Sequence, residues 1–460
     1  SLISWYNNLR IVREENEMKI ITTDVAAGRY FDETAAVWKE EPDRESGLVT
    51  IYPEKQYQSV LGFGGAFTQA AGYAWSALNS EQRSEAVNAY FSADGLGYRF
   101  CRTHINSCDF SLRNYCYVSD GDEALSTFST DCDEEYLLPL IRQAKEAAGE
   151  GLCLLATPWS PPPFMKTNGE MNHGGKLKPE YRNLWAEYIV RYLISYREKG
   201  IRVGYVSVQN EPKAVQTWDS CVYTPKEERD FALGYLKPAL DRAGLDVKIL
   251  LWDHNKERVY ENAKTYFEGD SEGIWGMGFH WYSGDHFENL QMVSEDYPEK
   301  SLIFTEGCVE YSRFDRNNLQ QQAEMYAHDM IGNFNHGCRA HIDWNLFLDE
   351  NGGPNHVGNY CAAPIMLHTK EHTIERQPSY YYIGHFSRYV KPRAVRIGIS
   401  RYTSEVEVCS FLNPDGSLAV ILLNREDHPV EVVLRHRTKT SALELAPHTI
   451  VTVTDEGEKQ

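Results

Sequence analysis

Several features that would direct the interpretation elsewhere are missing from this sequence of 460 residues. No apolar run approaches the roughly 20 residues that a membrane-spanning helix needs. Basic residues are in the minority, with 46 Lys and Arg against 66 Asp and Glu, and the formal net charge is −20. That acidity argues against nucleic acid or an anionic membrane as a partner. The sequence therefore predicts no transmembrane segment and no nucleic-acid partner.

The ten cysteines show no CxxC pair and no Cys/His spacing typical of a metal site. In a chain this long, buried and reduced thiols are the expected state. The glycines of GFGG, residues 62–65, lack the GxGxxG spacing of a dinucleotide-binding turn. We therefore expect neither a metal nor another cofactor.

The N-terminal stretch SLISWYNNLRIVREENEMK lacks the charged-then-apolar order of a signal peptide. On this ground we expect a cytoplasmic location, although a leader removed earlier would leave the same sequence. Nothing in the sequence indicates the oligomeric state.

What the sequence does contain is an alternation of strand-like and helix-like stretches between residues 58 and 390. The strand-like stretches are VLGFGGAFT, GYRFCRTHI, LCLLATPWS, VGYVSVQNEP, VKILLWD, WGMGFHWY, SLIFTEGC and RAHIDWNL. Apolar strands that alternate eight times with helices predict a parallel (β/α)8 barrel. A polar, glycine-rich insertion follows the last strand, at about residues 347–377, and is too long for an ordinary loop. We expect it to form a functional rim over the barrel mouth.

Residues 1–57 and 391–460 show short segments in which apolar and polar residues alternate, such as MKIITTD, LVTIYPE, EVEVCSFL and TIVTVT. DVAAGRYFDE and KEEPDRESG supply turns between the first of them. Such segments are typical of a β-sandwich. The predicted fold class is therefore α/β, a TIM barrel with a side β-sandwich built from both termini.

Two of the predicted barrel strands lead into a glutamate, Glu211 in VSVQNEP and Glu306 in SLIFTEGC. The carboxyl ends of barrel strands are where TIM-barrel enzymes carry their catalytic residues. Pro212 cannot continue a strand ladder, so we expect the first of these strands to end at Glu211. Retaining hydrolysis of a glycoside needs two carboxyl groups about 5–5.5 Å apart. We assign Glu211 as the acid/base and Glu306 as the nucleophile, whose charge should raise the pKa of Glu211.

Other strand-end residues are candidates for binding the sugar or supporting the two carboxyl groups. Asn210 could bind the sugar 2-hydroxyl, and Arg102 could hold the nucleophile ionised. Tyr282 could donate to the nucleophile, and His280 could form a hydrogen bond near the acid/base. Ordinary packing or structural roles are the rival interpretations of each. Aromatic rings that could contact the sugar or its leaving group are Trp159, Trp344 and Trp218.

These residues lie in stretches that resemble glycoside hydrolase family 30, and in particular its glucosylceramidase branch. The matching stretches include GFGGAFTQAA, GLGYRFCRTHINSCDFSLR, LLATPWSPPPFMKTNG, VQNEP, HWY, TEGC, DWNL and GGPNHVGN. The resemblance implies a (β/α)8 barrel with a side β-sandwich, retaining chemistry and no metal. It also implies the roles given above for Glu211 and Glu306, with Arg102 behind the nucleophile. Around the sugar it places Trp159, Asn210, Tyr282, Trp344 and Asn359.

One departure from the glucosylceramidase branch concerns Gln69, which stands where that branch has an aspartate in GGAxTDAA. We keep Gln69 as a substrate-binding candidate, but an amide makes a weaker, uncharged contact with a hydroxyl. Strict preference for glucose is therefore left open. The loop from Lys213 to Val222 is also shorter than in the branch, so we expect a different leaving-group site.

From these features we expect a β-glucosidase of glucosylceramidase type that acts on a small glycoside or an oligosaccharide, with sphingolipid metabolism as its setting. Alternatives within the family are β-xylosidase, β-fucosidase and endo-β-1,6-glucanase. Alternatives from other classes are a non-catalytic carbohydrate-binding protein and a metal-dependent hydrolase. The metal-dependent hydrolase would use Asp253, His254 and His280, which lack compact ligand spacing.

Overall fold

The computed structural model describes residues 17–41 and 46–455. Residues 1–16, which we predicted to belong to the side domain, lie outside the described part. The chain forms two compact units. One comprises Phe63–Arg316 and Ala340–Glu375, and the other comprises the chain up to Gly62, Asn317–Arg339 and the chain from Arg376. Within the described residues, no helix is both long enough and apolar enough to cross a bilayer.

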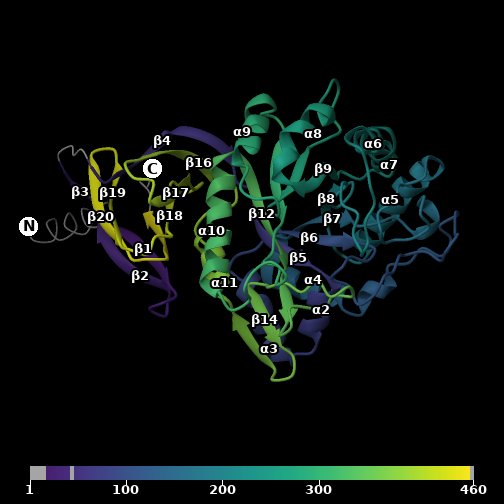
Figure 1. The fold of residues 1–460 in the computed structure, drawn as a ribbon, viewed down its shortest axis with the longest axis horizontal. Coiled ribbons are helices and arrows are strands. Elements are labelled where there is room, and N and C mark those ends of the chain that lie inside the picture. The colour runs from purple at the N-terminus through teal and green to yellow at the C-terminus, as the bar shows by residue number, and fades with distance from the viewer. Residues whose placement is uncertain (1–16, 42–45, 456–460) are drawn as a thin grey trace, which may run out of the picture. The chain divides into compact units, whose positions relative to one another are not determined.

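Eight strands close into a parallel barrel, which confirms the predicted fold (Figure 1). Nearly all of their residues are buried, which explains why their sequences are apolar without alternation. In chain order they are β5 (Gly62–Phe67), β6 (Phe100–Ile105), β7 (Cys153–Pro158), β8 (Val203–Ser207), β9 (Lys248–Asn255), β10 (Gly276–His280), β11 (Ser301–Glu306) and β12 (Cys338–Asn345).

Helices follow the strands along the chain. The start of α6 is as predicted, because Thr224 Oγ1 accepts from the N–H of Glu227 and Glu227 Oε2 accepts from the N–H of Thr224. Pro225 takes the first helical position, where no N–H is needed. The helices between β5 and β11 are α2 (Gln69–Ser76), α3 (Ser80–Phe91), α4 (Leu137–Ala148), α5 (Arg182–Glu198), α6 (Pro225–Phe231), α7 (Lys237–Arg242), α8 (Val259–Tyr266) and α9 (Phe287–Asp296).

The insertion after β12 contains a small sheet of its own. Its strands, in spatial order, are β13 (Phe347–Asp349), β14 (Ile365–His368) and β15 (Thr373–Arg376). Leu348 and Met366 of this sheet pack in one buried cluster with Trp344 at the end of β12. The insertion is therefore anchored beside a predicted sugar-binding residue.

Strands from both ends of the chain form the second unit, as predicted for the side β-sandwich. They share one apolar core, and α10 (Leu319–Asn335) and α11 (Pro378–Ser387) belong to the same unit. In spatial order the strands are β2 (Arg29–Val37), β1 (Glu17–Asp24), β21 (Thr449–Asp455), β18 (Leu418–Asn424), β17 (Val406–Leu412), β16 (Val395–Arg401), β4 (Leu48–Ser59), β19 (Val430–His436), β20 (Lys439–Leu445) and β3 (Lys39–Glu40).

One local prediction in this unit was wrong. The stretch DVAAGRYFDE was expected to be a turn, yet its second half begins β2. This strand is at the sheet edge and most of its residues are exposed or half-buried. A strand without a buried face has no need for the apolar alternation by which strands are recognised.

Candidate active site

Two strand irregularities shape the site at the carboxyl ends of β9 and β11. The pairing of β9 with β10 skips Asp253, and the pairing of β11 with β10 skips Thr305. A residue skipped in this way is turned out of the regular ladder, so such bulges commonly redirect side chains next to active sites. Here the two skipped residues meet, because Thr305 Oγ1 donates to Asp253 Oδ1 at 2.6 Å.

Asp253 is the centre of a fully buried polar network. Its Oδ2 accepts from Arg102 Nη2 at 3.0 Å and from Thr157 Oγ1 at 3.1 Å, and its Oδ1 lies 2.9 Å from His280 Nε2. Burial opposes ionisation, but Arg102 and His280 outweigh it and hold the pKa of Asp253 far below its usual value. Asp253 therefore acts here as the anchor of two cationic side chains.

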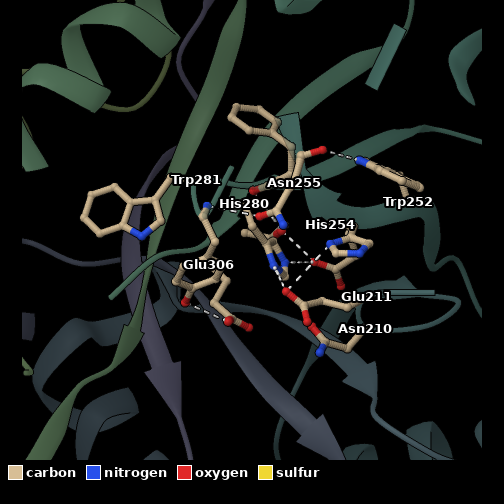
Figure 2. A network of polar contacts seen from close by, with 12 residues as sticks. Asn210, Glu211, Trp252, His254, Asn255, His280, Trp281 and Glu306 are labelled. Carbon is tan, nitrogen blue, oxygen red and sulfur yellow. Dashed lines mark hydrogen bonds and ion pairs between the residues drawn. The ribbon is translucent and has the colours of Figure 1, made fainter. Parts of the chain in front are cut away.

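Two members of the alternative metal-binding set, His254 and His280, lie close together (Figure 2), and the third, Asp253, has its Oδ1 2.9 Å from His280 Nε2. Both oxygens of Asp253, however, already have hydrogen-bond partners from protein side chains. In the part of the chain that the structure describes, no group of three His, Cys, Asp or Glu side chains is arranged to hold a metal ion.

Glu306 ends β11 and has a donor on each carboxylate oxygen. Arg102 Nη1 donates to Oε2 at 2.5 Å, and the hydroxyl of Tyr282 donates to Oε1 at 2.9 Å. Arg102 also donates from Nη2 to Asn210 Oδ1 at 2.8 Å, so one guanidinium connects β6 with the segment after β8 and the end of β11. The donors fix the orientation of the Glu306 carboxylate.

Glu211 is held by a turn rather than by a strand. We expected β8 to extend to Glu211, but it ends at Ser207. Glu211 has φ +47°, a left-handed conformation that is unfavourable for a residue with a side chain. Its N–H donates to the carbonyl of Asp253 at 3.0 Å, which stabilises this conformation and joins the end of β9 to the segment after β8.

Two imidazoles lie against the Glu211 carboxylate. His280 Nδ1 is 3.3 Å from Glu211 Oε1, and His254 Nδ1 is 3.7 Å from the same oxygen. Figure 2 shows both rings beside this carboxylate, which lies in the same field as Glu306. Each of the two glutamates therefore has groups beside it that can donate a hydrogen bond.

The electrostatics differ from the sequence-based expectation that Glu306 raises the pKa of Glu211. Burial acts in that direction, but His254 and His280 outweigh it, so the pKa of Glu211 is lowered. Burial raises the pKa of Glu306, His280 and Arg102 oppose this effect without reversing it, and the charge of Glu211 adds to it. His280 is buried, which disfavours its charge, yet the carboxylates of Glu306, Asp253 and Glu211 raise its pKa to about 9. The expectation was wrong because it left out the imidazoles.

Trp159 and Trp344 stack on each other and on Arg102. Their ring centroids are 5.3 Å apart, with the ring planes at 16°. The guanidinium carbon of Arg102 lies 4.7 Å from the Trp159 ring and 5.5 Å from the Trp344 ring, within the range of a cation–π contact. Trp218 and Tyr282 pack on the same cluster. The structure thus brings all four aromatic candidates together.

Gln69 and Asn359 join the site less directly. Gln69 is the first residue of α2, and its Oε1 accepts from the N–H of Leu112 at 2.9 Å. This bond occupies the oxygen of the amide, so the Nε2 group is the one available for a ligand. Asn359 donates from its backbone N–H to Asn355 Oδ1 at 3.1 Å. This contact does not tie the side chain of Asn359 to Glu306 or Glu211.

Asp109 is a residue of the site that the sequence analysis missed. It is buried, and Asn355 Nδ2 donates to its Oδ2 at 3.4 Å. Burial raises the pKa of Asp109 well above its usual value, and the charges of Glu306, Asp219 and Glu211 add to the effect. The Asp109 carboxyl is therefore close enough to both glutamates to be affected by their charges. The available signal was the lone acidic residue in SCDFS, just after β6.

Comparisons with known proteins agree with this geometry. The family model for the glycosyl hydrolase family 30 TIM-barrel domain matches residues 60–390, and that for the family 30 β-sandwich domain matches residues 394–453. Lysosomal acid glucosylceramidase of Mus musculus is 32% identical over 407 residues, which is 84% of this chain and 79% of that protein.

Two solved structures are similar over almost the whole chain. SrfJ from Salmonella typhimurium is 40% identical, with a TM-score of 0.93 over 95% of this chain and 99% of that one. The endo-beta1,6-glucanase BT3312 is 28% identical, with a TM-score of 0.86 over the same shares of the two chains.

Proposed function

Because the chain belongs to glycoside hydrolase family 30, we propose that it is a β-glucosidase of glucosylceramidase type that uses Glu211 and Glu306. Family membership makes the protein a retaining glycoside hydrolase. The observation that carries the proposal is the pair of donors on Glu306, since Arg102 and Tyr282 favour an ionised and oriented nucleophile. The likeness to a glucosylceramidase supports a β-glucoside as the substrate.

In the first step, one oxygen of Glu306 attacks the anomeric carbon and the bond to the leaving oxygen breaks. The leaving oxygen takes a proton from Glu211. Since the pKa of Glu211 is lowered, this proton is shared with His280, whose Nδ1 is 3.3 Å from Glu211 Oε1. His280 has a pKa of about 9 and carries the proton at neutral pH, so it can pass the proton to Glu211 as the leaving group departs.

In the second step, Glu211 is ionised and accepts a proton from water, which it passes back to His280, while the water oxygen attacks the anomeric carbon. The bond between the sugar and Glu306 breaks, and Glu306 recovers its negative charge against Arg102 and Tyr282. Two inversions at one carbon give net retention. Trp159 and Trp344, stacked on each other and almost fully buried, form an apolar wall beside Arg102, which holds the nucleophile.

The roles of the two glutamates can be separated by mutation. We expect Glu306→Gln to abolish turnover of every substrate, by about 10⁴-fold or more, because no covalent intermediate forms. Glu211→Ala should keep the first step with a dinitrophenyl glucoside, whose leaving group needs no proton, and added azide should restore release as the β-glucosyl azide. Equal losses for activated and unactivated leaving groups in Glu211→Ala would contradict its role as the acid.

A second candidate activity is endo-β-1,6-glucanase, which the similarity to BT3312 favours. Nitrophenyl β-glucoside, xyloside, fucoside and galactoside distinguish the exo-acting alternatives by kcat/KM. Glucosylceramide in detergent micelles tests the lipid glucoside. Release of oligosaccharides from a β-1,6-glucan, with little activity on the nitrophenyl sugars, would replace the β-glucosidase proposal by the glucanase.

A further inference from the structure

His254 is a histidine beside Glu211 that the mechanism above does not use. It follows Trp252 and Asp253, which have φ +73° and +47°, so two unfavourable backbone conformations come immediately before it. The ring of Trp252 lies 5.1 Å from the ring of His254. A backbone held in this way suggests that the direction of the His254 side chain matters to the site.

The Nδ1 atom of His254 is buried and has no hydrogen-bond partner among the described residues. Leaving a buried polar atom unpaired costs free energy. The nearest candidate partner is Glu211 Oε1 at 3.7 Å, slightly too far for a hydrogen bond. His280 Nδ1 takes the closer position on the same oxygen, at 3.3 Å. A small movement of Glu211 would therefore give His254 a partner.

The charges around His254 decide which form of the ring is present. Burial lowers the pKa of His254, and the charge on His280 acts in the same direction. The charges of Glu211, Glu257 and Asp253 oppose these effects, but the net direction is downward. The ring is therefore neutral at neutral pH and carries one hydrogen. An ionised Glu211 favours the tautomer with that hydrogen on Nδ1, because a carboxylate only accepts.

We propose that His254 is a positioning residue for Glu211, and that its Nδ1–H donates to Glu211 Oε1 when that carboxylate is ionised. Glu211 needs this second donor after it has protonated the leaving group and before it takes a proton from water. His280 has by then given up the proton that it shared with Glu211, so a second donor keeps the general base oriented. The inference rests on the proposed role of Glu211 as acid/base.

The test uses three variants that differ in where a donor remains. His254→Asn keeps an amide near the position of Nδ1, His254→Gln moves the amide to the position of Nε2, and His254→Leu has no donor. The substrate is 2,4-dinitrophenyl β-glucoside, for which the second step limits kcat. We expect His254→Leu to lower kcat about 10-fold and to move the acidic limb of the kcat–pH profile up by about one unit.

Rescue by the matched variant is the decisive comparison. His254→Asn should recover most of the lost kcat and the position of the acidic limb, whereas His254→Gln should behave like His254→Leu. Equal rescue by Asn and Gln, or an unchanged pH profile in a folded His254→Leu, would overturn the proposal. If His254→Leu does not fold, the histidine ¹⁵N chemical shifts of the wild type show which ring nitrogen of His254 carries the hydrogen. The proposal requires Nδ1–H in the enzyme trapped with a 2-fluoroglucosyl group, and Nε2–H there would overturn it.

A double-mutant comparison separates this inference from the proposed function. In a Glu211→Ala background, His254→Leu should cause no further loss, because its target is gone. If azide fails to rescue Glu211→Ala, the assignment of Glu211 fails, and the inference fails with it. If azide rescues Glu211→Ala while His254→Leu matches the wild type, only the role of His254 is rejected.

Discussion

At the scale of single residues, the site is defined by which positive group contacts which carboxylate. Arg102 forms hydrogen bonds with Glu306 and Asp253, while His280 forms them with Asp253 and Glu211. Asp253 is therefore a shared anchor, and its removal would leave two buried cations without part of their compensation. A loss of one charge in such a network changes the protonation of the remaining groups.

This network predicts the basic limb of the pH profile. His280 must be protonated to supply the acid, and its pKa is raised to about 9, so the charged form is present below that pH and is lost above it. We expect kcat/KM for an alkyl β-glucoside to hold from pH 7 to about 8 and to fall near 9. In Asp253→Asn one source of the raised pKa is gone, and the limb should move to lower pH by about one unit.

The control for this experiment is Thr305→Val, which removes one donor to Asp253 but keeps every charge. The basic limb of the pH profile should move less in Thr305→Val than in Asp253→Asn. A wild-type limb at or below pH 7 would show that His280 does not carry the proton.

The sequence revealed these residues unequally. Arg102, Tyr282 and Glu306 could be selected because each stands at or near the end of a recognisable strand. The positions of Asp253 and His254 depend on a register shift between β9 and β10, and no pattern of apolar residues encodes such a shift. Tertiary structure was needed to show that both surround Glu211.

At the scale of the elements, the barrel strands approach each other so closely that some positions admit only glycine. A Cβ at Gly64 in β5 would lie 1.8 Å from the carbonyl oxygen of Phe100 in β6. Phe100 is two residues before Arg102, so the close packing of β5 on β6 also helps to fix the position of the Arg102 side chain in the site. Gly64 of the GFGG stretch, which the sequence analysis separated from a nucleotide-binding turn, is thus explained by strand packing.

The matched pair Gly64→Ala and Gly234→Ala tests this explanation. Gly64→Ala must displace a buried backbone and should destabilise the protein by about 3 kcal/mol or more. At Gly234 a Cβ would meet no atom within 4 Å, so Gly234→Ala should be neutral or slightly stabilising. Chemical denaturation of both variants measures the difference. Comparable stability of the two would mean that β5 and β6 can separate without cost.

Element types were predictable wherever burial left a clear pattern. All eight barrel strands follow the predicted stretches, and the start of α6 follows its capping sequence. The exposed edge strand β2 and the short strands β13 to β15 in the insertion were not foreseen. The sequences of β2 and β15 bury too little on one face to show alternation, whereas β13 and β14 are buried but have only three and four residues, too few for a pattern.

At the scale of the whole molecule, the dominant property is the net charge of −20. A protein with this charge is repelled by an anionic lipid surface, and the repulsion is screened within about 8 Å at physiological salt. This matters for a β-glucosidase whose proposed substrate class includes a glucosylated lipid. Access to the surface, rather than the chemical step, would then limit turnover on anionic vesicles.

We therefore expect glucosylceramide in phosphatidylcholine vesicles to be hydrolysed severalfold faster than in vesicles containing phosphatidylserine at low salt. Added salt should reduce the difference, because it screens the repulsion. Nitrophenyl β-glucoside, measured beside either kind of vesicle, provides the control and should show no difference. Faster hydrolysis on the anionic vesicles would indicate a local basic surface that net charge does not reveal.

The contact between Arg102 and Glu306 suggests a variant of this enzyme that forms glycosidic bonds instead of breaking them. If the glutamate were shortened to glycine, the guanidinium would face the space that the carboxylate leaves. A glucosyl fluoride of α configuration could then seat its departing fluoride there, while the opposite carboxylate activates an incoming alcohol. Such a variant would assemble linkages that it no longer has the means to cleave.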